Sequence, residues 1–228
     1  MHAIFLEDKK TYLTLQLKVL LYTYIMSKET EDIKMIREMM EKSSKFLSFN
    51  GISIVFAGIF AIIGATFAHL FIRGDFGGRY NAILELSVLV LDALLVLFLS
   101  VCSVTFFCWK KAKANHESLF SSTTRRAAYS LLLPLFTGGV FSLVFLFRGD
   151  LHTVYAATLI FYGLGLVNAS KYTQPELNHL GIANVILGLS AVFLTDLSLY
   201  LWAAGFGICH IIIGAIMYVK YEKTGKTK

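Results

Sequence analysis

The sequence predicts an all-α protein, a polytopic transmembrane bundle of about six helices, and three observations carry this prediction. Of the 228 residues, 56% are hydrophobic and only 16% are charged, whereas soluble domains have about 45–50% apolar and about 25% charged residues. The charges gather in clusters, and the apolar runs between them are about 20 residues long, enough to cross a hydrocarbon core of about 30 Å. Only two prolines are present, so long helices can continue without a break.

Six apolar segments between residues 49 and 219 account for the predicted spans. We expect these spans at about 51–72, 82–109, 127–147, 153–169, 180–195 and 199–219. The fifth segment is short, but Thr173-Gln174-Pro175-Glu176 has the pattern of a capping box with proline in the first turn, which extends that helix back to about Gln174. Weak similarity between 139–172 and 188–221 indicates either three parallel helical hairpins that repeat along the chain or a chance likeness among apolar helices.

The segment before the first span divides into two parts. Met26 and the polar residues after it resemble an ordinary bacterial N-terminus, so we expect residues 1–25 to be a non-native or disordered extension. Residues 26–48 have the pattern of a cytoplasmic amphipathic helix, with Thr30 as its N-cap. This helix either lies in the membrane interface or is a solvated lead-in helix. Its apolar side would carry Ile33, Ile36, Met40 and Leu47.

The basic residues predict the orientation of the chain. From Met26 onward, fifteen Lys and Arg residues fall before the first span, between the second and third, after the fourth and after the sixth. The other side carries three, Arg73, Arg79 and Arg148. Basic residues are enriched in cytoplasmic loops, which predicts a bacterial inner-membrane protein with both termini inside. Residues 220–228 then form a basic cytoplasmic tail. The net charge of +6 does not indicate nucleic acid, because no soluble basic domain is present to bind it.

Patterns typical of catalysis or metal binding are missing from the sequence. Cys102, Cys108 and Cys209 lie in apolar segments without the spacing of a metal site. HExxH, GxSxG and P-loop motifs are also absent. We therefore expect no cofactor and no enzymatic activity. The predicted partners are the lipid bilayer and either another membrane protein or a second copy of the chain.

Several stretches carry a resemblance to a known family. They read IREMMEKSS at 36–44, FAGIF at 56–60, ATLIFYG at 157–163 and VNASKY at 167–172, with Gly-Phe-Gly at 205–207 leading through His210 to Met-Tyr at 217–218. The chain resembles an uncharacterised family of six-span integral membrane proteins of Bacteroidota type, from about Met26 onward. Because this family has no assigned activity, the resemblance implies a fold and no catalytic residues.

Two acidic residues lie within the predicted second span. Glu85 and Asp92 are seven residues apart, so they lie on one face of the helix, with Asp92 about 10 Å deeper than Glu85. An ionised side chain inside a span costs at least about 2.5–3.5 kcal/mol on insertion scales. They form either an acidic path for a cation or proton, or an interfacial glutamate and an aspartate that a polar partner or a bound proton neutralises.

His210 lies in a stripe of small residues on the sixth span. A similar stripe on the fifth span contains Asn184, and we expect Asn184 and His210 to lie at the same depth and to hydrogen-bond across a tight hairpin. The alternative is that His210 is a protonatable switch or ligand site. The two stripes consist of Ala203, Gly207, His210 and Gly214, and of Asn184, Gly188, Ala191 and Thr195. A polar and small face on the fourth span points to the same interior and carries Tyr155, Thr158, Tyr162, Gly165 and Ala169.

These patterns favour a non-catalytic accessory, sensor or structural membrane protein. The alternative is a transporter or channel for a small solute or ion that uses Glu85 and Asp92. Two features count against transport: charge inside the spans is sparse, and no predicted span is clearly interrupted at mid-membrane by Gly or Pro.

Overall fold

The computed structural model describes residues 18, 20–24, 26–28, 30–36, 50–74, 82–114 and 122–223. These residues form helices and short turns and contain no strand. Six of the helices are long and apolar enough to cross a membrane. The prediction of an all-α, six-span, multi-pass membrane protein is therefore confirmed.

The N-terminal unit, Met1–Ser44, is compact by itself and distinct from the rest of the chain. Its described residues, between 18 and 36, are helical and exposed. Thr30 lies inside this helix and its hydroxyl donates to the carbonyl of Met26 at 2.7 Å, so the prediction that Thr30 is an N-cap is wrong. The helix continues on the N-terminal side of Thr30 through 26–28. The remainder of the predicted amphipathic helix, residues 37–48, lies outside the described residues.

The first five spans are single helices. They are α2 (Gly51–Arg73), α3 (Ala82–Ala114), α4 (Ser122–Phe147), α5 (Leu151–Ala169) and α6 (Glu176–Phe193). The sixth span is made of four consecutive pieces, α7 (Ser198–Ala203), the π-helical turn η3 (Ala204–Cys209), α8 (His210–Tyr218) and the π-helical turn η4 (Val219–Lys223). The main difference from the predicted bounds is at α3 and α4, which include basic residues beyond their apolar parts, because Lys and Arg do not interrupt a helix.

Local side-chain chemistry fixes the beginnings and ends of the helices. The side chain of Asn50 accepts from the backbone N–H of Ile52 at 2.9 Å and caps α2. Asp150 caps α5 by accepting from the N–H of Thr153 at 3.1 Å and from its hydroxyl at 2.6 Å. These two bonds, with the hydroxyl first, hold the pKa of Asp150 below its usual value. Gly149 precedes this cap with a φ of +75°, which only glycine adopts without strain.

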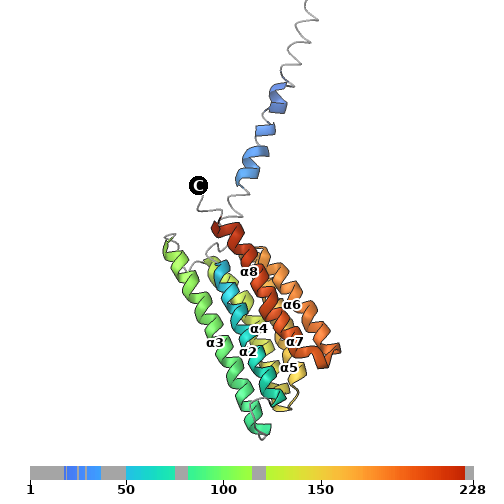
Figure 1. Cartoon of the computed structure of the whole chain (residues 1–228). Coiled ribbons are helices and arrows are strands. Elements are labelled where there is room, and N and C mark those ends of the chain that lie inside the picture. The colour runs from blue at the N-terminus through green and yellow to red at the C-terminus, as the bar shows by residue number, and fades with distance from the viewer. Residues whose placement is uncertain are drawn as a thin grey trace, which may run out of the picture. The chain divides into compact units, whose positions relative to one another are not determined.

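The helices pack in an order that differs from their order in the chain. Figure 1 shows α3 on one flank of the bundle, beside α2. α2 packs in turn against the sixth span, and α5 packs against both α4 and α6. In each of the three predicted hairpins, which are α2 with α3, α4 with α5, and α6 with the sixth span, the two helices contact each other. The repetition of these hairpins stays a prediction.

Glycines allow the closest approaches between helices. A Cβ atom added to Gly58 of α2 would lie 2.7 Å from the carbonyl oxygen of Gly207, and one added to Gly214 would lie 2.8 Å from that of Gly51. Across α5 and α6, Cβ atoms on Gly163 and Gly181 would lie 2.6 and 2.7 Å from the carbonyl oxygen of the opposite glycine. At these distances only a hydrogen atom fits between the two backbones.

The expected pairing of the fifth and sixth spans along their small-residue stripes is therefore wrong. In the sixth span, Gly207 and Gly214 face the first span, α2, and the glycines of α6 face α5. A stripe of small residues allows another helix to approach, but its composition does not specify which helix this is.

Pro134 lies inside α4, where it cannot donate a backbone hydrogen bond to the carbonyl four residues earlier. That carbonyl belongs to Ser130, and the side-chain amide of Asn168 on α5 donates to it at 3.2 Å. The Nζ atom of Lys171 in turn donates to the side-chain oxygen of Asn168 at 3.2 Å. A polar side chain from the neighbouring span thus satisfies the backbone group that proline leaves free, as hydrocarbon surroundings require.

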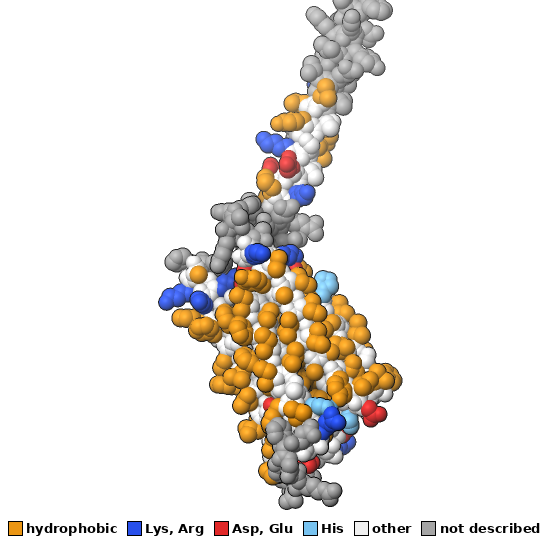
Figure 2. Space-filling model, in the orientation of Figure 1, with side chains coloured by type: hydrophobic (Ala, Val, Ile, Leu, Met, Phe, Trp, Pro, Cys, Tyr) orange, Lys and Arg blue, Asp and Glu red, His pale blue; other side chains and the backbone are white. Residues whose placement is uncertain are grey.

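The described surface of the bundle is apolar along its side and charged at its ends. Figure 2 shows hydrophobic side chains over the height of this face, with Lys and Arg gathered mainly near one end. We call this end, which carries the C-terminal ends of α3 and of the sixth span, the basic end; it includes Lys110, Lys111, Lys113, Lys220 and Lys223. An apolar side surface of this kind is what lipid chains contact.

Replacing Gly58 with alanine tests the close approach of α2 and the sixth span. We expect Gly58→Ala to lower the free energy of unfolding by about 2 kcal/mol, because the methyl group would press on the backbone of Gly207. Thermal unfolding of the purified protein in detergent measures the loss. Gly139→Ala is the matched control, since nothing lies within 4 Å of a Cβ atom at Gly139. Equal effects of the two variants would contradict the packing described.

A double-mutant cycle tests whether the Asn168 side chain replaces the hydrogen bond that Pro134 cannot donate to Ser130. Asn168→Ala should cost about 1–2 kcal/mol, because it leaves the partly buried Ser130 carbonyl without a donor. In a Pro134→Ala background the new N–H at position 134 bonds to Ser130, so the same Asn168→Ala change should cost less than half as much. Unfolding in detergent of the four proteins gives both values. An unchanged cost in the two backgrounds would show that Asn168 acts on something else.

Candidate functional site

His210 is the most enclosed ionisable side chain among the described residues of the sixth span, with 4% of its surface exposed. Its Nε2 atom lies 2.8 Å from the hydroxyl of Tyr162 on α5, and its Nδ1 atom lies 2.9 Å from the carbonyl oxygen of Gly205. Because a carbonyl only accepts, Nδ1 carries the hydrogen and donates it to Gly205. In the neutral ring Nε2 is then the acceptor, and the Tyr162 hydroxyl donates to it.

Aromatic rings surround this pair of hydrogen bonds. Phe206 lies between Trp202, with ring centres 4.8 Å apart, and Tyr162, with ring centres 4.9 Å apart. The indole N–H of Trp202 donates to the hydroxyl of Thr158 on α5 at 3.2 Å. These contacts join α5 to the sixth span by polar bonds inside an apolar cluster, where each bond is stronger than in water.

The sixth span changes from α- to π-helix at Ala204–Cys209, directly before His210. Such turns are rare and occur frequently at functional sites. The turn keeps the chain helical, so it does not contradict the expectation that no span is clearly interrupted at mid-membrane by Gly or Pro. The sequence gave no signal for it, because π-helical hydrogen bonding needs no proline.

The predicted hydrogen bond between Asn184 and His210 is wrong. Asn184 is fully buried, and its amide nitrogen donates to the carbonyl of Leu180 on its own helix at 2.8 Å. Its side-chain oxygen makes no hydrogen bond and lies 2.7 Å from the position of a Cβ atom on Gly205. Asn184 and His210 therefore both lie beside Gly205 without bonding to each other. The partner of His210 is Tyr162, which belongs to the polar face predicted for the fourth span.

The two acids of α3 lie apart from this cluster. Glu85 is exposed in the first turn of α3. Asp92 is half-buried beside α2, and a Cβ atom on Gly64 would lie 3.4 and 3.5 Å from its two carboxylate oxygens. Among the described residues no donor hydrogen-bonds to Asp92. The structure thus does not bring Glu85 and Asp92 together with Asn184 and His210 in one site.

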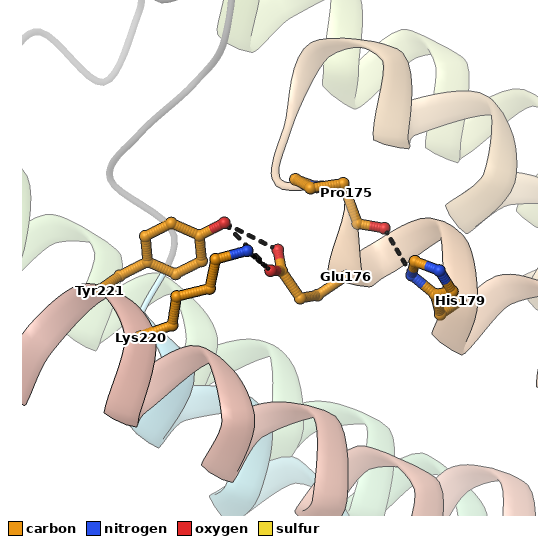
Figure 3. A network of polar contacts seen from close by, with 5 residues as sticks. All are labelled: Pro175, Glu176, His179, Lys220 and Tyr221. Carbon is orange, nitrogen blue, oxygen red and sulfur yellow. Dashed lines mark hydrogen bonds and ion pairs between the residues drawn. The ribbon is translucent and has the colours of Figure 1, made fainter.

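A second polar cluster lies at the basic end and is shown in Figure 3. The carboxylate of Glu176, at the start of α6, accepts from Lys220 at 2.6 Å and from the hydroxyl of Tyr221 at 3.0 and 3.1 Å. Nearby, the carboxylate of Glu222 accepts from the backbone N–H of Gly51 at 2.7 Å. The η4 turn therefore bonds to the first residues of both α6 and α2.

This cluster corrects the predicted capping box at Thr173–Glu176. The Thr173 hydroxyl donates backward to the carbonyl of Ala169 at 3.1 Å, and Glu176 bonds to the sixth span instead of to the backbone of Thr173. The sequence pattern gave no signal for a partner 44 residues away. Helix α6 begins at Glu176, two residues after the predicted start at Gln174.

Comparison with known proteins adds no family to these observations. The chain matches no protein-family model, no curated protein and no solved structure. The resemblance to a bacterial membrane-protein family stays a prediction. Within the described residues, no group of three or more His, Cys, Asp or Glu side chains is placed to hold a metal ion.

Removing the Tyr162 hydroxyl tests its role in the bundle. Tyr162→Phe should lower the free energy of unfolding by about 1–2 kcal/mol, because the buried Nε2 atom of His210 loses its donor. Tyr200→Phe is the matched control, since Tyr200 is 54% exposed and its hydroxyl lies 3.5 Å from another imidazole, that of His69. Thermal unfolding in detergent measures both changes. A larger loss for Tyr200→Phe would mean that the buried bond contributes little.

Proposed function

We propose that this multi-pass protein resides in the bacterial cytoplasmic membrane with both termini in the cytoplasm. The basic end then faces the cytoplasm, in accordance with the excess of Lys and Arg in cytoplasmic segments. Lys110, Lys171 and Lys220 all belong to segments on that side. Arg73 and Arg148 then face the periplasm.

In this membrane the protein acts as a non-catalytic accessory or sensor protein of another membrane protein. The observation that supports this proposal is the contrast between its two sets of intramembrane polar groups. The groups that join α5 to the sixth span mostly bond to one another, as Tyr162 does to His210 and Trp202 does to Thr158. Asp92 lies on the least buried span and bonds to no described donor. The free polar group is thus at the edge of the bundle, where another protein can reach it.

Transport of a small solute or ion is the second candidate. It is favoured by the π-helical turn before His210 and by the presence of a carboxylate, Asp92, inside the second span. Irregular spans and intramembrane acids are features of ion pathways. The separation of Asp92 from the hydrogen-bonded cluster of His210 ranks this candidate second.

Reporter fusions test the proposed orientation. A reporter that is active only in the periplasm should stay silent when fused after Lys228, because the C-terminus follows an even number of spans. The same reporter fused after Gly149, which follows the third span, should be active. Reversed activities of the two fusions would refute the orientation.

A flux assay separates the two functional candidates. Purified protein in liposomes should conduct protons, Na⁺ and K⁺ no faster than empty liposomes, because the accessory role requires no path. Ion-sensitive dyes inside the liposomes report the flux. Asp92→Asn and the exposed control Glu85→Gln should behave as the unmodified protein does. A cation flux that Asp92→Asn abolishes and Glu85→Gln retains would establish transport in place of the accessory role.

A further inference from the structure

One stripe of α3 has a heptad pattern, and the other described helices leave most of it exposed. The stripe, which we call the α3 seam, recurs at alternating spacings of four and three residues and consists of Val88, Asp92, Leu95, Leu99, Cys102 and Phe106. Leu95, Leu99 and Phe106 are 54%, 37% and 55% exposed, and Cys102 is exposed as well. Alternation of four and three is the spacing with which one helix packs along another.

Helix α2 occupies a different side of α3. It contacts α3 through Val96, which lies against Gly64, and through Phe107, whose ring stacks on Phe56 at 5.6 Å. Val96 and Phe107 lie beside the α3 seam and leave most of it open. Asp92 of the seam lies against Gly64 of α2, which accounts for its partial burial.

The charge of Asp92 restricts what can cover the α3 seam. Intramembrane carboxylates pair with basic groups, and no described residue supplies one to Asp92. None of the six spans carries Lys or Arg away from its ends. A second copy of the chain in the same orientation would therefore bring another carboxylate to this depth. A lysine or arginine in a helix of a different protein complements Asp92.

We propose that the α3 seam binds a transmembrane helix of a different membrane protein, whose lysine or arginine forms an ion pair with Asp92. The inference rests on the accessory function proposed above and specifies its partner by chemistry. The apolar seam residues pack against that helix at the shallow crossing angle typical of membrane bundles, and the ion pair fixes its depth.

Synthetic transmembrane peptides test this pairing. Each peptide is a Leu/Ala helix with one cysteine placed to meet Cys102, and it carries either lysine or leucine at the position opposite Asp92. The full chain, with Cys108→Ala and Cys209→Ala, is reconstituted with each peptide in phosphatidylcholine vesicles and oxidised mildly to form disulfides. At equal, subsaturating density the lysine peptide should cross-link about tenfold more than the leucine peptide, the ratio expected from one strong charge contact.

Variants of the chain separate charge pairing from general adhesion. Asp92→Asn should remove the preference for the lysine peptide, and Asp92→Lys should transfer the preference to a peptide with aspartate at that position. Val101→Cys with Cys102→Ser is the matched control, because Val101 is 54% exposed, lies at nearly the depth of Cys102 and points about 100° away from it around α3. This control should show no dependence on lysine.

Three results would overturn the inference. They are equal cross-linking of the lysine and leucine peptides, lysine-dependent cross-linking from position 101, and cross-linking between the Cys102 residues of two chains that added peptide does not diminish. The last result would assign the α3 seam to a second copy. If the inference fails and the liposomes show no cation flux, the accessory function still stands with another docking surface. A flux that depends on Asp92 refutes the accessory function itself.

Discussion

Every peptide group inside a membrane must find a partner within the protein, and in this bundle side chains bond to backbone carbonyls beside Pro134 and at a π-helical turn of the sixth span. At Pro134 the helix loses a donor, and the amide of Asn168 replaces it at the carbonyl of Ser130. At the π-helical turn of the sixth span, His210 donates to the carbonyl of Gly205. In both cases α5 takes part, through Asn168 and through the Tyr162 hydroxyl that orients His210. Helix α5 therefore connects α4 to the sixth span.

The sequence was sufficient for the spans and insufficient for their contacts. Long apolar runs define spans because the thickness of the bilayer sets their length. Which spans pack against each other was harder to predict. Gly207 and Gly214 allow another helix to come close, but their positions in the sequence do not show that this helix is α2. The partner of His210 was missed for a related reason: the expected stripe assumed regular helical spacing, and the extra residue in a π turn rotates the next part of the helix by about a quarter turn. Asn168 was the one contact with a usable signal, since proline inside a span requires a nearby donor.

For the acidic residues, too, the sequence predicted positions along a helix but not the contacts of the side chains. Sequence spacing placed Glu85 and Asp92 on one helix face and left open whether they form a path or stand alone. The structure leaves Glu85 exposed and puts Asp92 against Gly64, where the missing side chain gives the carboxylate room. An isolated carboxylate in this position carries a free-energy cost that a basic partner relieves. The sequence pattern cannot show this arrangement, because it depends on which helices pack beside α3.

The close approaches of Gly51 and Gly58 of α2 to Gly214 and Gly207 of the sixth span also have a consequence for biogenesis. Among the six spans described, α2 leaves the ribosome first and the sixth span last. During synthesis these two glycines have no native neighbour until the sixth span has been made. The backbone N–H of Gly51 likewise lacks its side-chain acceptor until Glu222 has been synthesised. Closure of the bundle is thus a late, long-range step, and chains released early by the ribosome leave this face of α2 available to chaperones and membrane proteases.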